Sequence, residues 1–417
     1  MLIHNISQLL TLNGGPQRGK DLGRLGIIEQ GAVLMRGDTI VAVGPQDELI
    51  TKYPDEQRMD ANGKVMLPGF VDPHTHLVWA GDRAVEFEMR LEGRTYLEIL
   101  AAGGGIISTV KATRQCEYDD LYAQTRARAR TMLRYGTTTA EAKTGYGLEL
   151  KSELDQLKIL LDLDDEGPLE IIPTFLPAHA IAPEYQTDPD GYTRLICEKM
   201  LPAAYEWWLK HETGRPLPFV DVFCETGAFS LEQSRCILTR ARDLGFPLKI
   251  HADEFDNLGG AQLAAELGAA SADHLVKTSS DDIAALAASD TVAVALPCTP
   301  FGLAETHYTP AKEILDAGGL LALATDCNPG TAWCENMQFV IALACRVLKL
   351  TPAQAVAAAT INSAAAIQRD DRIGSIEPGK QADMILLTVN DYRHLGYRFG
   401  ENLVNMVIKK GRMIPIV

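Results

Sequence analysis

Five of the nine histidines in this 417-residue chain lie at or just after predicted strand ends, together with several acidic residues. The pair His74-Thr75-His76 places two imidazoles on the same side of an extended chain, because strand side chains alternate with a period of two. Such a pair suits a shared metal ion. His251 and Asp326, at two other strand ends, complete a set of nitrogen and oxygen ligands that fits Zn²⁺ or iron. We therefore predict a metal centre held by His74, His76, His251 and Asp326.

Two further side chains near this set can move protons. Glu254 follows His251 by three residues, where a carboxylate can take a proton from a metal-activated water and pass it to a leaving nitrogen. His274, directly after Asp273 at the next strand end, can orient or polarise the same water. The alternative interpretations are a helix-start charge for Glu254 and a buried structural imidazole for His274.

The elements that must position these residues lie between residues 67 and 375, where apolar strand-like runs alternate with amphipathic helical stretches. Helices are expected at 119–135 and 231–244, among others, and each strand–helix–strand return is expected to be right-handed. Eight βα units predict a (β/α)₈ TIM barrel with its active site at the C-terminal ends of the strands. The predicted strands span residues 69–74, 137–143, 171–176, 219–224, 248–251, 270–274, 292–296 and 320–325.

Both ends of the chain show a different pattern, in which short strands are separated by turns. Residues 31–44 contain two strand-like runs around a Gly-Asp turn, and residues 382–389 and 403–408 contain similar runs. We predict that residues 1–66 and 376–417 form one small β-sandwich domain beside a barrel domain of residues 67–375. A chain of this length accommodates a barrel-sized domain and a minor one.

Composition narrows the class of partner and the compartment. The formal net charge is −16 and no basic stripe is present, which disfavours nucleic acid as a partner. No apolar run approaches the ~18–20 residues of a membrane span, and the N-terminus lacks the features of a secretory signal. The eight cysteines are scattered without a CxxC pair, which argues against a disulfide framework. These observations predict a cytoplasmic protein that acts on a small molecule.

Several stretches resemble signatures of a known family. Pro68-Gly-Phe-Val-Asp-Pro-His-Thr-His76 resembles the first-strand signature of the amidohydrolase superfamily. The similarity extends over the whole chain and is closest to the imidazolonepropionase family of histidine degradation. The stretches that carry the closer similarity are residues 77–83, 103–110, 141–148, 251–254, 270–275 and 324–330.

This resemblance implies hydrolysis of the ring amide of 4-imidazolone-5-propanoate to N-formimino-L-glutamate, with a metal-bound hydroxide as the nucleophile. It implies one Zn²⁺ or Fe³⁺ ion per chain on the four ligands named above, and a homodimer. Glu254 is the expected proton shuttle, and His274 and Asp326 are expected to assist catalysis. The substrate contacts carried over from the family are Arg83, Tyr96, Tyr146, His179, Glu254, Asn328, Gly330 and Thr331. Arg83 offers a planar fork for the propanoate carboxylate, although a surface ion pair is the alternative.

Binuclear relatives carry a carboxylated lysine on the fourth barrel strand, where this chain has Asp221-Val-Phe-Cys-Glu225 and no lysine. One metal ion is therefore favoured.

Residues 210–215, within the stretch 205–216, look like a local insertion without an assigned role. Two other functions stay open. A deaminase of nucleobase-like rings would share the barrel, the HxH pair and an HxxE motif, and a scaffold without activity would keep only the fold. The complete ligand set and Glu254 argue against the scaffold.

Overall fold

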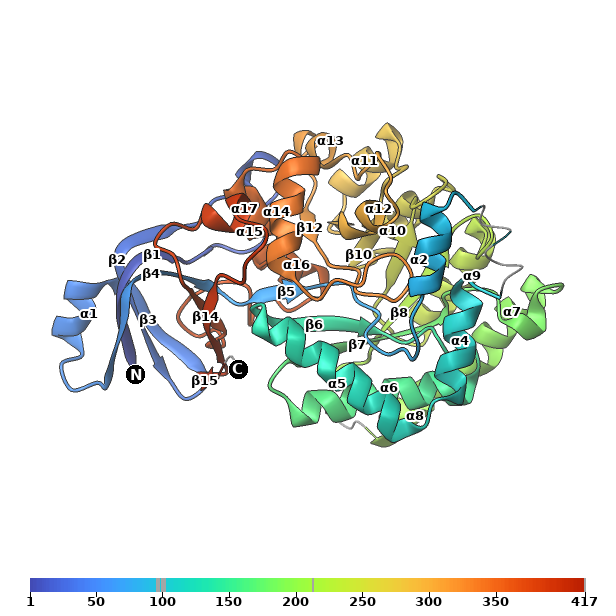
Figure 1. The fold of residues 1–417 in the computed structure, drawn as a ribbon, viewed down its shortest axis with the longest axis horizontal. Coiled ribbons are helices and arrows are strands. Elements are labelled where there is room, and N and C mark those ends of the chain that lie inside the picture. The colour runs from blue at the N-terminus through green and yellow to red at the C-terminus, as the bar shows by residue number, and fades with distance from the viewer. Residues whose placement is uncertain (95–97, 99–102, 212–213, 416–417) are drawn as a thin grey trace.

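The computed structural model describes residues 1–94, 98, 103–211 and 214–415, which form a barrel and a smaller sheet beside it (Figure 1). Tyr96 and residues 212–213 of the predicted insertion lie outside this part of the chain. Among the described residues, every helix is too short or too polar to cross a bilayer.

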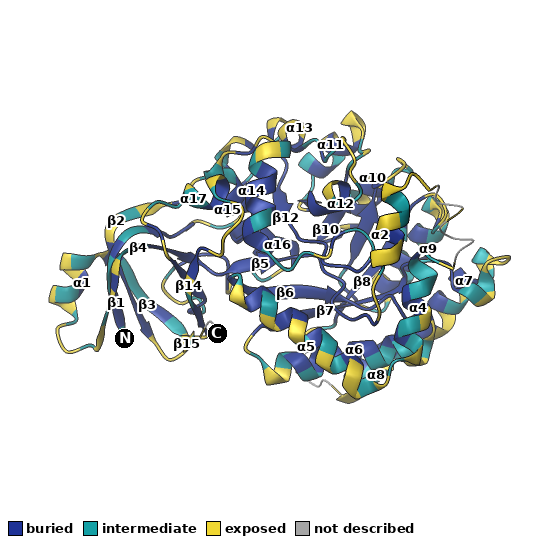
Figure 2. Ribbon diagram, viewed as in Figure 1, coloured by how far each residue is buried: buried dark blue, intermediate teal, exposed yellow. Residues whose placement is uncertain are grey.

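Eight parallel strands form the barrel, as the sequence predicts. Each strand pairs with the next in chain order. Figure 2 shows buried strands surrounded by helices that carry the exposed residues, which is the arrangement that all-parallel sheets require. The strands are β5 (Phe70–Asp72), β6 (Thr137–Lys143), β7 (Glu170–Ala178), β8 (Phe219–Cys224), β9 (Lys249–Ala252), β10 (Ser271–His274), β11 (Val292–Ala295) and β12 (Leu321–Leu323).

Helices fill the connections between the strands, and the two expected helices are found as α5 and α9. Capping boxes at Ser230 and Ser279 start α9 and α11, because each serine side chain accepts a backbone N–H that the first turn leaves unpaired. The longer barrel helices are α4 (Ile106–Gln115), α5 (Tyr118–Arg134), α6 (Leu150–Glu166), α8 (Leu201–His211), α9 (Leu231–Asp243), α10 (Gly260–Leu267), α11 (Ser280–Ala287) and α14 (Met337–Val347). Shorter helices are α1 (Gln46–Lys52), α2 (Ala84–Leu91), α7 (Pro189–Leu195), α12 (Cys298–Gly302), α13 (Ala311–Asp316), α15 (Pro352–Ala358), α16 (Ile361–Ala366) and α17 (His394–Tyr397).

The barrel is closed by the segments that follow its first and last strands. Thr75 forms a parallel bridge with Cys327. The N–H of Asp326 donates to the carbonyl of His74 at 3.1 Å, and the N–H of His76 donates to the carbonyl of Cys327 at 3.0 Å. Two predicted ligand segments that are about 250 residues apart in sequence therefore run side by side.

Strands from both chain ends form one seven-stranded mixed sheet in the order β15-β14-β13-β4-β1-β2-β3. The predicted Gly-Asp turn joins β2 to β3, with Gly37 at a φ of +59° that favours glycine. In the edge strand β3, the N–H of Ile40 donates to the carbonyl of Lys380, so this strand lies beside the segment that precedes β13. These strands are β1 (Leu2–Leu10), β2 (Ile27–Arg36), β3 (Thr39–Pro45), β4 (Arg58–Pro68), β13 (Met384–Leu387), β14 (Val404–Lys409) and β15 (Arg412–Ile414).

The shared sheet confirms that both chain ends build one β-domain, whereas its limits at residues 66 and 376 stay a prediction.

A buried ionic cluster joins this domain to the barrel. Nζ of Lys409 lies 2.6 Å from Asp383 Oδ2 and 3.0 Å from Oε2 of Glu170, the first residue of β7. The N-terminal ends of the barrel strands therefore face the sheet, and their C-terminal ends face away from it (Figure 1).

Candidate metal centre and active site

Three histidines and one aspartate from three strand ends converge at the mouth of the barrel. Nε2 of His76 lies 3.3 Å from Nε2 of His74 and 3.3 Å from Nε2 of His251. Oδ1 of Asp326 lies 3.5 Å from Nε2 of both His74 and His76. All four side chains are buried. The structure thus brings together the four residues that the sequence predicts as metal ligands, here called the ligand quartet.

Two of the three imidazoles of the quartet have a carboxylate beside Nδ1. Oδ2 of Asp273 lies 2.6 Å from Nδ1 of His74, and Oδ2 of Asp221 lies 3.0 Å from Nδ1 of His251. A carboxylate that accepts the proton of Nδ1, as Asp273 can from His74, leaves the lone pair on Nε2 directed inward. Burial lowers the pKa of His74 and His76 well below the ordinary value, so both rings are neutral. Two nitrogens bound at ~2.0–2.1 Å to a tetrahedral ion lie about 3.3 Å apart, which matches the separation observed.

Asp326 supplies the oxygen of the quartet. The hydroxyl of Thr299 donates to Oδ2, whereas Oδ1 is buried and has no hydrogen-bond donor among the described residues. Burial raises the pKa of this carboxyl to about 6. A buried acceptor without a donor is unfavourable unless a proton or a cation fills the place. The quartet therefore fits a metal ion.

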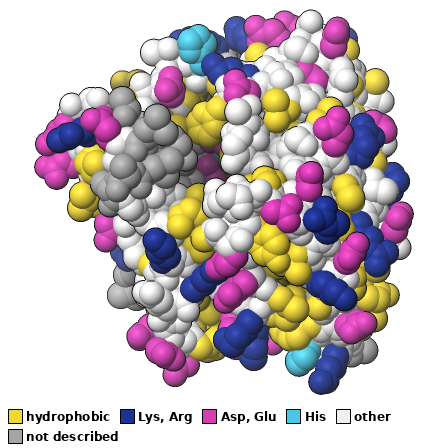
Figure 3. Space-filling model, turned by 90° about the vertical axis from the view of Figure 1, so that its right-hand side faces the viewer, with side chains coloured by type: hydrophobic (Ala, Val, Ile, Leu, Met, Phe, Trp, Pro, Cys, Tyr) yellow, Lys and Arg dark blue, Asp and Glu magenta, His cyan; other side chains and the backbone are white. Residues whose placement is uncertain are grey.

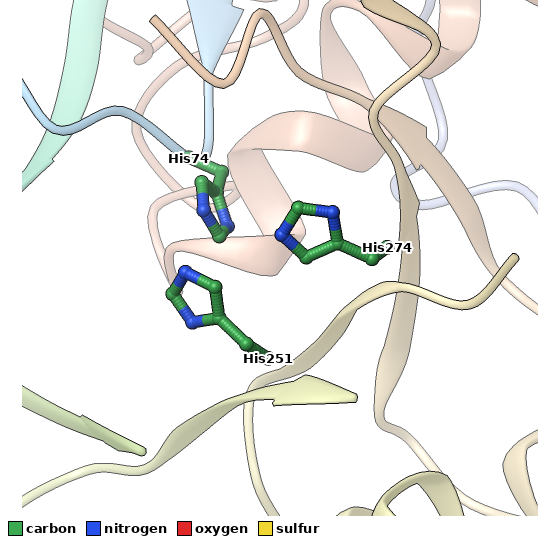
Figure 4. Close-up of side chains that lie close together, drawn as sticks. All are labelled: His74, His251 and His274. Carbon is green, nitrogen blue, oxygen red and sulfur yellow. The ribbon is translucent and has the colours of Figure 1, made fainter. Parts of the chain in front are cut away.

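Glu254 and His274 lie beside the quartet. Oε2 of Glu254 is 3.7 Å from Nε2 of His274, and the rings of His74, His251 and His274 turn toward a common centre (Figure 4). Burial raises the pKa of Glu254 well above its usual range, with Asp326 adding to the effect, and burial lowers the pKa of His274. A carboxyl with a raised pKa can both accept and return a proton near neutral pH.

His179 and Tyr146 line the side of the mouth next to His76. The ring of His179 stacks on that of His76 at a centroid distance of 4.6 Å, and Tyr146 lies 5.2 Å from His179. Burial lowers the pKa of His179 to about 3, to which His251 contributes, so the ring is neutral. These two predicted substrate contacts therefore border the quartet.

Arg83 is paired with Glu86, a residue that the sequence interpretation missed. Nε and Nη2 of Arg83 lie 2.9 and 2.8 Å from Oε2 of Glu86. The other oxygen of Glu86 accepts the N–H of Gly105 at 2.9 Å. Nη1 of Arg83 lies against Gly330, where an added Cβ would come within 2.1 Å of it. The pairing spans three residues at the start of α2, and this i,i+3 spacing is the signal in the sequence that could have indicated it.

Asn328 organises the loop that follows Asp326. Its Oδ1 accepts the N–H groups of Gly330 at 2.8 Å and Thr331 at 2.9 Å, and its Nδ2 donates to the Asp326 carbonyl at 2.7 Å. The loop thus places Gly330 beside Arg83, at the rim of the mouth. Contacts of Asn328, Gly330 and Thr331 with a substrate stay predictions. The same holds for Tyr96, which lies outside the described residues.

The view in Figure 3, from the barrel end of the molecule, shows acidic and basic side chains interspersed, with a hollow that has an acidic side chain inside it. No continuous basic surface appears on this face. This face therefore lacks the basic stripe that binding of a polyanion requires.

A parallel βα barrel with three histidines and an aspartate at the mouth defines the class of metal-dependent hydrolases with the amidohydrolase fold. A sequence profile of the amidohydrolase family matches residues 65–414, and one of the imidazolonepropionase-like composite domain of bacteria matches residues 31–55. Imidazolonepropionases of Herpetosiphon aurantiacus and Chloroflexus aggregans are 51% and 47% identical to this chain over 99% of its length, covering 96% and 98% of those proteins. The chain belongs to the imidazolonepropionase family.

Solved structures with low sequence identity share the fold. Triazine hydrolase of Arthrobacter aurescens superposes with a TM-score of 0.76 at 17% identity, covering 99% of this chain and 94% of that one. Guanine deaminase of Escherichia coli gives a TM-score of 0.72 at 17% identity, covering 99% of each chain. At this identity the likeness establishes the architecture alone.

Proposed function

We propose that this chain hydrolyses the ring amide of 4-imidazolone-5-propanoate to N-formimino-L-glutamate. The observation that carries the proposal is the full-length identity of 51% with an imidazolonepropionase, in a chain whose ligand quartet and Glu254 are assembled at one barrel mouth. A five-membered cyclic amide with a propanoate arm needs a nucleophilic water, a proton carrier for the leaving nitrogen and a cation for the carboxylate.

The quartet His74, His76, His251 and Asp326 would hold one ion, for which we propose Zn²⁺ or Fe³⁺. When bound, such an ion lowers the pKa of a water from ~16 toward ~7 and polarises a carbonyl oxygen. A single ion is supported by the fourth barrel strand, which offers Asp221 near the quartet instead of a lysine. That aspartate is already engaged with His251.

Glu254 is the residue that moves the proton. Its carboxylate accepts a proton from the attacking water and delivers it to the ring nitrogen as the carbon–nitrogen bond breaks. His274, 3.7 Å from Glu254, stabilises the carbonyl oxygen of the ring amide as that oxygen gains negative charge. Both side chains are buried, which strengthens these electrostatic interactions relative to water.

Arg83 anchors the substrate through its carboxylate. Glu86 holds two of the guanidinium nitrogens, and Nη1 is left beside Gly330 at the rim. Tyr146 and His179 form the wall against which the ring packs. We also propose that the enzyme works in the cytoplasm as a homodimer, which sedimentation velocity would test.

Product analysis tests the proposed reaction. We expect purified protein to convert 4-imidazolone-5-propanoate to formiminoglutamate without release of ammonia, with close to one metal ion per chain. Ammonia release from a nucleobase-like ring, without ring opening of the imidazolone, would instead support the deaminase. Two metal ions per chain would contradict the mononuclear site.

A further inference from the structure

A lysine is completely buried directly behind the ligand quartet. Lys143, the last residue of β6, has no exposed side-chain surface. Its Nζ lies 2.8 Å from Oε1 of Glu141, 2.8 Å from Oδ2 of Asp221 and 3.9 Å from Oδ2 of Asp273. An isolated ammonium group at this depth would be strongly unfavourable. One cation thus contacts two carboxylates directly and lies near a third.

Each of these carboxylates also supports a part of the quartet. Asp221 and Asp273 contact Nδ1 of His251 and His74, respectively. Oε2 of Glu141 accepts the N–H of Thr75 at 3.2 Å, between the two histidines of the HxH pair. The N–H of Lys143 itself donates to the carbonyl of Thr75 at 2.9 Å. Two of the three histidine ligands, His251 and His74, therefore each contact a carboxylate that lies near this ammonium group, and Glu141 holds the backbone between His74 and His76.

We propose that Lys143 is a positioning residue for the metal centre and sets its affinity for the ion. Its ammonium group fixes the orientation of Asp221, 2.8 Å away, and this carboxylate turns Nε2 of His251 toward the ion. Asp273 lies 3.9 Å from both buried lysines, so it does not distinguish Lys143 from Lys249. Without the lysine, the carboxylates lose the cation that holds them in place, and their like charges favour other side-chain conformations. The inference rests on the proposed metal site, but it does not depend on which substrate is hydrolysed.

A second buried lysine provides a matched control. Lys249 on β9 is also completely buried, but its Nζ contacts Ser271 Oγ at 2.6 Å and the Ala366 carbonyl at 3.2 Å. It is 3.9 Å from Asp273. If a buried positive charge served only to balance the acidic groups of the core, replacement of either lysine would affect metal binding to the same extent.

The experiment is a zinc titration against a chelator of known affinity, performed on metal-free protein. We expect Lys143→Met to raise the zinc dissociation constant by ~10- to 100-fold, which is the usual effect of losing a group that supports metal ligands. Lys249→Met should leave the constant close to that of the unaltered chain. Thermal unfolding of each metal-free variant is measured in parallel, so that a loss of fold stability is separated from a loss of affinity.

A double variant tests the route through Asp221. In Lys143→Met/Asp221→Asn, one positive and one negative charge are removed together, which helps the protein to fold. If the lysine acts through this aspartate, Lys143→Met should weaken zinc binding less in the Asp221→Asn background than in the unaltered chain.

An unchanged dissociation constant in Lys143→Met would overturn the inference, and so would fully additive effects of the two substitutions. Failure of the unaltered chain to bind zinc or iron would contradict the proposed function itself, so the two failures are distinguishable. If Lys143→Met does not fold, Asp221→Asn alone still tests the route, because an unchanged zinc dissociation constant in that variant would overturn the inference.

Discussion

Arg83→Lys tests how the substrate is anchored. In the structure, the guanidinium group uses Nε and Nη2 on Glu86 and presents Nη1 beside Gly330. A lysine has one nitrogen, so it cannot contact Glu86 and also reach a carboxylate at the rim. Loss of one charged hydrogen bond costs ~1.5–3 kcal/mol, which corresponds to a decrease of about ten- to a hundredfold in kcat/KM. Metal content should not change, because within the described part of the chain Arg83 has no contact with any residue of the quartet.

Steady-state kinetics on two compounds separate anchoring from other roles of this arginine. The variant should lose kcat/KM on 4-imidazolone-5-propanoate, mainly through KM, but match the unaltered chain on an imidazolone without the propanoate arm. Arg90→Lys is the matched control, because Arg90 lies on α2, which begins directly after Arg83, and donates to the Gly330 carbonyl at 2.9 Å. An equal loss on both compounds would refute the anchoring role and assign Arg83 to the shape of the loop.

Glu254→Gln should keep the metal but lower kcat by ~10²- to 10⁴-fold, because an amide cannot accept the proton. Metal analysis and steady-state kinetics test both parts of this prediction. A near-normal kcat would assign the proton transfer to His274 instead. The ionic cluster below the barrel predicts acid sensitivity. Burial would raise the pKa of Glu170, but Lys409 and Gln381 hold this pKa at about 2, against an ordinary value of 4.5. The ionised carboxylate therefore adds about 3 kcal/mol to the free energy of unfolding above pH 4.5. This contribution is lost as the pH falls toward 2. In urea unfolding at several pH values, Lys409→Met should lower stability at pH 7 and reduce the loss below pH 4.5, whereas an unchanged pH dependence would contradict the assignment.

The barrel and the quartet could be predicted from the sequence because both depend on local patterns. Short apolar runs mark the strands, and in a parallel barrel all their C-terminal ends meet at one mouth. His74 and His76 are identified by their alternation along one strand, and His251 and Asp326 by their positions at strand ends. The topology alone was then sufficient to place these four side chains together.

The residues that orient the quartet could not be identified in this way. Lys143 ends the predicted strand 137–143, but it lies beside Asp221 and Asp273 on two other strands that are far away in sequence. Thr299 reaches Asp326 from α12, which no periodicity indicates. Such contacts depend on side-chain conformations inside the barrel, and a single sequence does not specify them.

The two halves of the quartet are supported by different parts of the barrel. Asp273 and Asp221 lie at Nδ1 of His74 and His251, and Asp221 also contacts the ammonium group of Lys143, so the geometry of these two histidines depends on charges buried below the site. Asp326 is positioned by the closing contact with His74 and by the loop of Asn328. An ion bound to all four residues would therefore link the segments that follow β5 and β12, the two barrel strands that have no ladder between them. Because binding stabilises the state that holds the ion, the metal would act on barrel closure as well as on the bound water.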